Sequence, residues 1–133
     1  MTDDELGQAF AVSALPADAW THREHLRVAW LHLRAFEVDE AHLRMRVGII
    51  RLNASHGLVE TAERGYHETL TRFWLNLVRS LVTPVPAASS DAFLEMHAER
   101  LTRDAPLRYY TRDRIMSLRA RAAFVEPDLL PLP

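Results

Sequence analysis

The helical spacing of apolar positions is clearest in the segment THREHLRVAWLHLRAFE, from Thr21 to Glu37. One side of this segment, at about 100° per residue, carries Leu26, Ala29, Leu33 and Phe36. His22 and His25 continue the same stripe at its N-terminal end. Glu24 follows Thr21 at the spacing of a capping box, in which each side chain bonds a free backbone N–H of the first turn. We therefore expect a helix over residues 21–37 with both histidines facing inward.

A second helical pattern runs to about His56, with Asp39 as its N-cap and Gly57 just past its end. Its apolar residues form two faces: Ala41, Met45, Ile49 and Leu52 on one, and Leu43, Val47, Ile50 and Ala54 on the other. This pattern predicts a helix buried on two sides in the middle of the fold. Gly48 would allow a neighbouring element to approach that helix closely.

A third helix is predicted over residues 66–82, after a glycine-bounded loop. Its apolar stripe consists of Tyr66, Leu70, Phe73, Trp74, Leu77 and Leu81, and His67 lies at the edge of this stripe. The prolines of TPVPAASSD end the pattern, after which Ser89 or Ser90 can cap a fourth helix to about Arg103. Further on, Thr111 and Ser117 can each cap a short helix.

No segment shows the period-two alternation of a β-strand, and 133 residues suit one domain with a core of its own. The expected fold is all-α: a single-domain bundle, residues 1–133, of four principal helices with short C-terminal helices. The proline-containing residues 126–133 are expected to form an extended tail. Residues 1–19 are expected to form a loosely ordered N-terminal segment.

The composition limits the functional groups and the partners that the protein can have. Cysteine is absent, which excludes disulfides, thiolate zinc sites and a cysteine nucleophile and leaves imidazole and carboxylate as metal ligands. The 16 basic residues are all arginine and are dispersed among 18 acidic ones, so the net charge of −2 does not favour a nucleic-acid partner. The acidic start MTDDELGQAF does not have the pattern of a signal peptide, and the apolar segment FWLNLVRSLV is too short to span a membrane. We expect a soluble, cytoplasmic protein without a membrane partner.

Four of the seven histidines are expected to meet at one end of the bundle. Because the first two predicted helices are joined by only a few residues, they should be antiparallel, which returns His56 to the level of His22 and His25. The third helix starts from the same end, so His67 and Glu68 should lie there too. By the same reasoning, His42 should lie at the opposite pole.

A histidine cluster of this kind favours a transition-metal site. Two histidines three residues apart on one helical face can bind one ion, and a third ligand from another helix leaves a position open for water or substrate. The favoured hypothesis is a small metal-binding protein, with metal-dependent catalysis as its enzymatic form. Zinc or iron would be held by His22, His25, His56 and His67, and Glu68 would act as ligand or as base towards bound water. The HxxH spacing matches neither HExxH nor HxxEH.

The alternative is a non-catalytic binding or interaction module whose buried histidines are structural. Such a module would act through a helix-lined pocket for a small molecule or through a self-association face. The aromatic residues Tyr66, Trp74, Trp30 and Phe73 are expected to belong to the core.

The sequence also gives expectations for two further groups of polar residues. Arg23, Arg27 and Arg34 are expected to form a solvated face paired with Glu24 and Glu37. The run Arg108, Tyr109 and Tyr110 either lines a pocket or closes a helix end.

The segments THREHLRVAWLHLR, GYHETLTRFW and ARAAFVEPDL together resemble a group of small helical bacterial proteins. That group shares an HxxH segment leading into AW and a YHET segment that opens a later helix. The resemblance covers most of the chain from Trp20 to about Leu129. It implies that His22, His25, His67 and Glu68 match the group's motifs, whereas His56 rests on the geometric argument alone.

Overall fold

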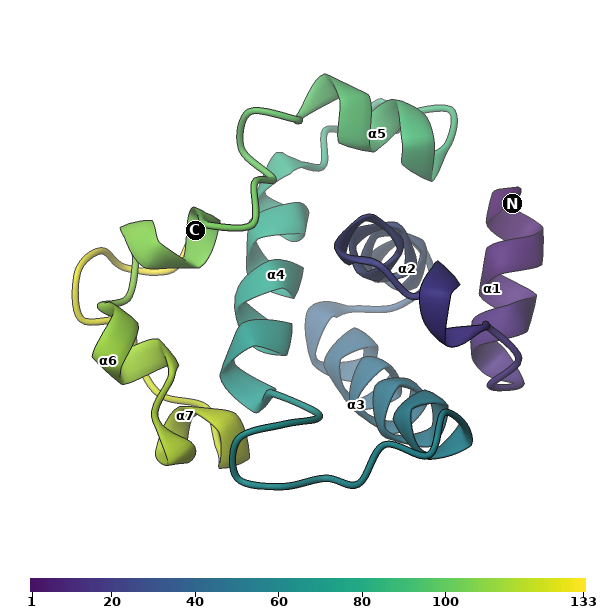
Figure 1. Cartoon of the computed structure of the whole chain (residues 1–133). Coiled ribbons are helices and arrows are strands. Elements are labelled where there is room, and N and C mark those ends of the chain that lie inside the picture. Colours follow the sequence, from purple (N-terminus) through teal and green to yellow (C-terminus); the bar gives the residue numbers. More distant parts are fainter.

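The computed structural model describes all 133 residues, which form seven α-helices and two short 3-10 helices and no strand (Figure 1). The α-helices are α1 (Asp3–Ala11), α2 (His22–Ala35), α3 (Val38–Ser55), α4 (Glu68–Leu81), α5 (Ser90–Met96), α6 (Arg112–Ile115) and α7 (Leu118–Ala122). The 3-10 helices are η1 (Ala17–Ala19) and η2 (Ala105–Arg108). The all-α fold class is therefore confirmed. None of these helices combines the length and the apolar character needed to cross a membrane.

The ends of α2, α3 and α4 lie near their predicted positions. At the start of α2, the hydroxyl of Thr21 accepts a hydrogen bond from the backbone N–H of Glu24, at 3.5 Å. Gly57 follows α3 with a φ of 73°, the left-handed conformation that glycine adopts at low cost. The predicted cap Asp39 lies instead within the first turn of α3.

The later helices are shorter than expected. Ser89, Thr111 and Ser117 each cap a helix with their hydroxyl groups, at the starts of α5, α6 and α7. However, α5 ends at Met96, so the prediction that it continues to Arg103 is wrong. Between the buried residues Leu94 and Leu101 no side chain is buried, and hence none anchors a further turn of helix on the core.

The N-terminal segment contains a helix where a loosely ordered segment was expected. The side chain of Thr2 caps α1 by accepting a hydrogen bond from the N–H of Glu5. Three acidic residues occupy the first turn, where their negative charge interacts favourably with the helix dipole. Leu6 and Phe10, one turn apart, are buried at 0% and 3% exposure. These two side chains tie α1 to the rest of the fold.

The fold has two hydrophobic cores, and helices α2 and α4 contribute residues to both. The larger one joins α2, α4 and α5 to the C-terminal third of the chain through Trp30, Phe73, Phe93, Tyr110 and their neighbours. The other joins α1, α2 and α3, with Leu75 of α4. In Figure 1, α1 and the pair α6 and α7 lie on opposite sides of the molecule, with α2, α3 and α4 between them. Helices α2 and α4 therefore form the centre.

Helix α3 is buried on one side only. Its first predicted face is buried, through Ala41, Met45, Ile49 and Leu52. On the second face, Leu43, Val47 and Ile50 are 54%, 46% and 38% exposed, so the prediction of a helix buried on two sides is wrong. An apolar stripe shows which residues can be buried, but it does not show whether a partner element reaches them.

Gly48 permits the close approach that the sequence suggested. A Cβ atom at this position would lie 2.3 Å from two ring atoms of Phe10. Gly7, in the middle of α1, has nothing within 4 Å of the corresponding point. The two glycines therefore differ in the space around them.

We expect Gly48→Ala to lower the free energy of unfolding by roughly 1–3 kcal/mol, because the added methyl group displaces the Phe10 ring. The matched variant Gly7→Ala should raise it by roughly 0.5–1 kcal/mol, because alanine is the better helix former. Urea denaturation of both variants measures these changes. A stabilising Gly48→Ala would contradict the close packing of α1 on α3.

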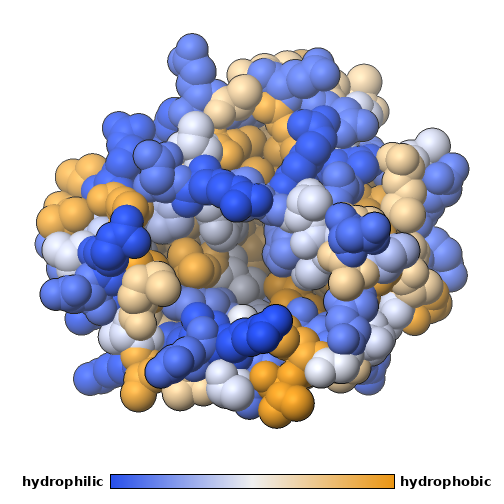
Figure 2. Space-filling view, viewed as in Figure 1, coloured by the Kyte–Doolittle hydropathy of each residue, from blue (hydrophilic) through white to orange (hydrophobic).

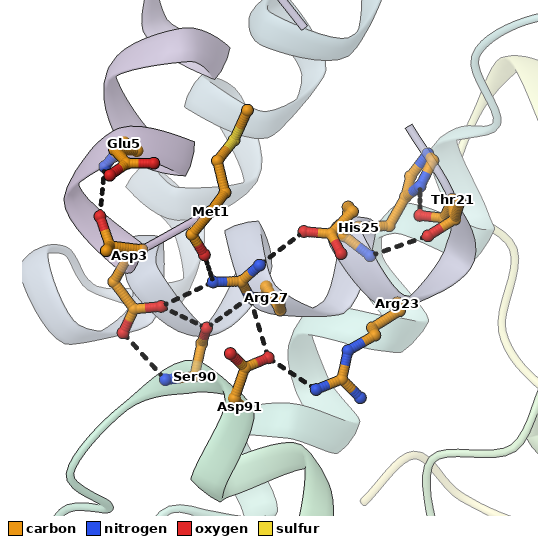
Figure 3. A network of polar contacts seen from close by, with 11 residues as sticks. Met1, Asp3, Glu5, Thr21, Arg23, His25, Arg27, Ser90 and Asp91 are labelled. Carbon is orange, nitrogen blue, oxygen red and sulfur yellow. Dashed lines mark hydrogen bonds and ion pairs between the residues drawn. The ribbon is translucent and has the colours of Figure 1, made fainter. Parts of the chain in front are cut away.

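A buried arginine joins α1, α2 and α5 (Figure 3). Arg27 was expected on a solvated face but is 4% exposed. Its guanidinium donates to the hydroxyl of Ser90 at 2.8 Å, to Glu24 at 2.9 Å, to the Met1 carbonyl at 2.8 Å and to Asp3 at 3.2 Å. Burial opposes ionisation of Asp3, but hydrogen bonds from Ser90 and the Arg27 charge lower its pKa below the ordinary value.

The C-terminal residues close around Tyr110, which is fully buried. Its hydroxyl donates to the carbonyl of Val125 at 2.8 Å, and burial raises its pKa to about 12. The Tyr109 carbonyl accepts from the N–H of Leu129, while Arg108 ends η2 and is exposed. Neither Tyr109 nor Tyr110 lines the cavity described below.

Candidate functional site

A cavity of about 570 Å³ lies between the start of α2, the middle of α3 and the first turns of α4. Its wall consists of Trp20, His22, His25, Leu26 and Ala29 at α2; Met45, Ile49 and Asn53 on α3; Leu58, Gly65 and Tyr66 in the loop; His67, Leu70, Thr71, Trp74 and Leu75 at α4; and Arg103 and Pro106. Figure 2 shows a hollow near the centre of the face of the molecule in view, with hydrophilic side chains around it. Three of the four histidines expected to converge thus share one cavity.

His22 and His25 lie on the inner side of α2, as predicted. The His25 ring stacks on Trp20 with their centroids 3.7 Å apart, and its Nδ1 hydrogen-bonds the Thr21 carbonyl at 2.7 Å. Because a carbonyl only accepts, Nδ1 carries the proton and Nε2 keeps its lone pair. His22 packs edge-on against Trp74, at 4.9 Å between centroids, and its Nε2 is buried without a hydrogen-bond partner.

His67 is engaged through both ring nitrogens. As the N-cap of α4, its Nδ1 accepts a hydrogen bond from the N–H of Leu70 at 3.1 Å. Its Nε2 donates to the carbonyl of Ile115 at 2.8 Å. This pairing fixes the neutral tautomer and leaves no lone pair free for a metal ion. His67 therefore fastens α6 to the start of α4.

His56 lies outside the cavity wall and donates through Nε2 to the carbonyl of Leu15, at 2.6 Å. Glu68 lies beside His42, with 2.9 Å between Oε1 and Nε2, so the placement of Glu68 at the same end of α3 as His56 is wrong. An extended chain covers about 3.3 Å per residue, so residues 56–67 can run back along most of α3. Glu60, one of the two glutamates of this loop, accepts hydrogen bonds from Asn53 and from the N–H of Tyr66 and so joins the loop to α3 and to the start of α4.

Glu68 is not part of the cavity wall and is held by three donors. Tyr66 donates to it at 2.5 Å, His42 at 2.9 Å, and Arg46 forms an ion pair with it. Burial raises the pKa of Glu68, but these three hydrogen bonds outweigh it and the pKa lies below the ordinary value. Burial lowers the pKa of His42 despite the neighbouring carboxylate, so this contact is a hydrogen bond from a neutral ring. The cluster fastens α3 to the start of α4.

The possible metal ligands are dispersed. No group of three or more histidine, aspartate or glutamate side chains is placed to hold one metal ion, and cysteine is absent. Within the cavity, His25 has a free lone pair and His22 has an unpartnered nitrogen. The prediction of a zinc or iron site at His22, His25, His56 and His67, with Glu68 as ligand or base, stays a prediction.

Sequence reasoning missed Trp20 and Arg103 as parts of the site. Trp20 directly precedes the cap Thr21, where an apolar side chain often folds back onto the first turns of a helix, so a signal was present. Arg103 gave no signal, because the fourth helix was expected to extend to it. Of the aromatic residues expected in the core, Trp30 and Phe73 are buried there, and Tyr66 and Trp74 pack against the two cores while also lining the cavity.

Burial keeps the cavity histidines neutral. It lowers the pKa of His25 to about 4, with a further lowering from His22. Burial also lowers the pKa of His22 and of His67, and the charges of Arg103 and Arg121, respectively, act in the same direction. All three rings are therefore uncharged at neutral pH.

These shifts predict acid sensitivity. The unfolded chain binds a proton at His25 near pH 6.5 and the folded chain only near pH 4, so stability present above pH 6.5 is lost as the pH falls between these values. We expect the His25→Gln variant to lose roughly 1–3 kcal/mol less unfolding free energy on acidification than the parent does, allowing for the partial exposure of the ring. Urea denaturation of both proteins at pH 7 and pH 4.5 compares the losses. Equal losses would contradict the buried, neutral state of His25.

The chain matches no protein-family model, no curated protein and no solved structure.

Proposed function

We propose that the protein binds a small molecule in the cavity between α2, α3 and α4. The observation that carries this proposal is a concave space of about 570 Å³ with a mostly apolar wall, into which aromatic rings and a few polar groups converge. Small-molecule sites commonly have volumes of about 300–1,000 Å³ and this kind of lining.

Unpartnered polar atoms in the wall support the proposal. The indole N–H of Trp20 and the Nε2 of His22 are both buried without a hydrogen-bond partner. Leaving a buried polar group unpaired costs about 1–3 kcal/mol, and native proteins rarely retain such groups without a role. Both residues belong to the cavity wall, so these unpaired groups lie beside the proposed site.

The histidine contacts support binding rather than acid–base chemistry. His67 uses both ring nitrogens to hold the backbone together, and the carboxylate of Glu68, which is not part of the cavity wall, is occupied by three donors. Both residues belong to the segment GYHETLTRFW, from which a reactive site was expected. Their contacts instead support a rigid frame around the cavity.

A cavity-filling variant tests the proposal. Calorimetric titration of the parent with 2-naphthoate, its neutral amide or 2-naphthylmethylammonium should give binding of at least one probe with a Kd of about 1 mM or tighter, from about 0.3 kcal/mol per non-hydrogen atom. Thr71→Phe fills the cavity from α4 and should weaken that binding more than about tenfold. The matched variant Asn76→Phe adds the same ring to α4 outside the cavity wall and should bind as the parent does. Absence of binding by all three probes would overturn the proposal.

The second candidate is a divalent metal ion, zinc or iron, at His22 and His25, with metal-dependent catalysis as its enzymatic form. The favouring observation is the hydrogen bond from Nδ1 of His25 to the Thr21 carbonyl, because metal-binding histidines commonly donate their other nitrogen in this way. Metal analysis of protein purified without a metal-affinity step tests it. His25→Ala should then release the ion and His67→Ala should not, since both nitrogens of His67 are engaged. A metal-free parent would sink this candidate.

A further inference from the structure

We propose that the ligand of this cavity is a small carboxylate with a planar, apolar body, such as an aromatic acid. This inference rests on the proposed small-molecule-binding function and concerns the charge and shape of the ligand. It is carried by the distribution of charged, polar and aromatic groups in the wall.

The wall contains no carboxylate, although the chain has 18 aspartate and glutamate residues. The one residue in the wall that carries a full charge at neutral pH is Arg103. No carboxylate lies within 4.0 Å of its guanidinium, because every ion pair at that distance involves another residue. The cavity therefore offers an uncompensated positive charge to an anion.

Three acidic side chains adjacent in the chain to wall residues, or in the loop beside them, bond other partners. Glu60, in the loop beside the cavity, accepts from Asn53 and from the N–H of Tyr66. Asp104, next to Arg103 in the chain, accepts from the Thr102 hydroxyl at 2.6 Å. Glu68 is occupied by its three donors. An anion would thus meet no free carboxylate in the wall.

Arg103 lies at the mouth of the cavity, since it is exposed yet belongs to the wall. Burial and, in addition, the charge of Arg103 lower the pKa of the His22 ring, which belongs to the same wall. A carboxylate at this mouth would pair with the Arg103 guanidinium, while the apolar body of the ligand enters the cavity. Charge-assisted hydrogen bonds of this kind are about twice as strong as neutral ones.

The inner part of the cavity suits a flat ring. Trp20, stacked on His25, and Trp74, edge-on to His22, present aromatic surfaces, while Met45 and Ile49 supply apolar contacts. Aromatic rings prefer offset-stacked or edge-to-face partners at centroid distances of about 4.5–7 Å. Trp20 is already stacked on both His25 and Phe10, so a planar ligand would make its aromatic contact edge-to-face with Trp74.

Four probes separate charge from shape in calorimetric titrations of the parent protein: 2-naphthoate, its neutral amide 2-naphthamide, 2-naphthylmethylammonium and octanoate. We expect 2-naphthoate to bind about tenfold more tightly than the amide of the same shape, and the cation to bind most weakly. Octanoate, which has the charge without the planar body, should bind more weakly than 2-naphthoate.

Two variants locate the effect. Arg103→Gln should reduce the preference for 2-naphthoate over the amide by about two- to fivefold, as expected for one partly exposed charge. Arg100→Gln removes an exposed arginine outside the wall and should leave the preference unchanged.

The possible failures are distinguishable. Equal or tighter binding of the amide, the cation or octanoate would overturn the anionic, planar ligand while leaving a small-molecule-binding cavity in place. A preference for 2-naphthoate that survives Arg103→Gln unchanged would overturn the role of Arg103. Absence of binding by every probe would overturn the proposed function itself.

Discussion

Replacing Phe73 with alanine is expected to lower the free energy of unfolding by about 3–5 kcal/mol. Phe73 is fully buried on α4, and its ring lies 5.2 Å from the rings of Trp74 and Tyr109 and 6.4 Å from that of Tyr110, centroid to centroid. Because these neighbours come from two parts of the chain, the cavity left by the ring cannot collapse easily. Urea denaturation measures the loss, and the m-value should stay the same as that of the parent protein.

The matched control is Ile50→Ala on the outer face of α3, where the side chain is 38% exposed. Its expected cost is below about 1 kcal/mol, because little apolar surface returns to water. Comparable losses at the two positions would mean that α3, and not α4, lies at the centre of the molecule.

Arg27→Met should lower the free energy of unfolding by about 2–4 kcal/mol. Removing one member of a buried ion pair commonly costs about 3–5 kcal/mol, and the lower value allows for the partial exposure of Asp3 and Glu24. Methionine keeps most of the apolar stem, so the loss reports the guanidinium contacts with Asp3, Ser90 and the Met1 carbonyl. Thermal unfolding followed by circular dichroism measures it.

Arg23→Met provides the comparison on the same helix. Arg23 is half-exposed and pairs with Asp91 at 2.6 Å, and such surface pairs contribute about 0.2–1 kcal/mol. A loss at Arg27 as small as that at Arg23 would show that the buried network does not hold α1 and α5 against α2.

Much of the fold could be predicted because periodicity and capping act locally. The spacing of Leu26, Ala29 and Leu33 and the cap at Thr21 specify α2 without reference to the rest of the chain. The outer face of α3 was misjudged because burial depends on whether another element covers the stripe. Leu43, Val47 and Ile50 have the correct spacing, but no helix reaches them.

The candidate site was predictable only in part. His22 and His25 could be assigned to the inner face of α2, and both line the cavity with His67. Glu68 was misplaced because the sequence specifies the length of the loop over residues 56–67 but not its direction. Arg103 enters the wall only because the chain turns after Met96, which no local pattern indicates.

The most direct test of the cavity as a binding site uses the indole N–H resonances of the three tryptophans in the ¹⁵N-labelled protein. Trp20 and Trp74 line the cavity, whereas Trp30 is 2% exposed in the larger core and serves as an internal reference. On titration with 2-naphthoate, the Trp20 and Trp74 resonances should shift together with saturation, and the Trp30 resonance should stay in place. Unchanged Trp20 and Trp74 resonances, or a shift of Trp30 as large as theirs, would contradict a small-molecule site between α2, α3 and α4.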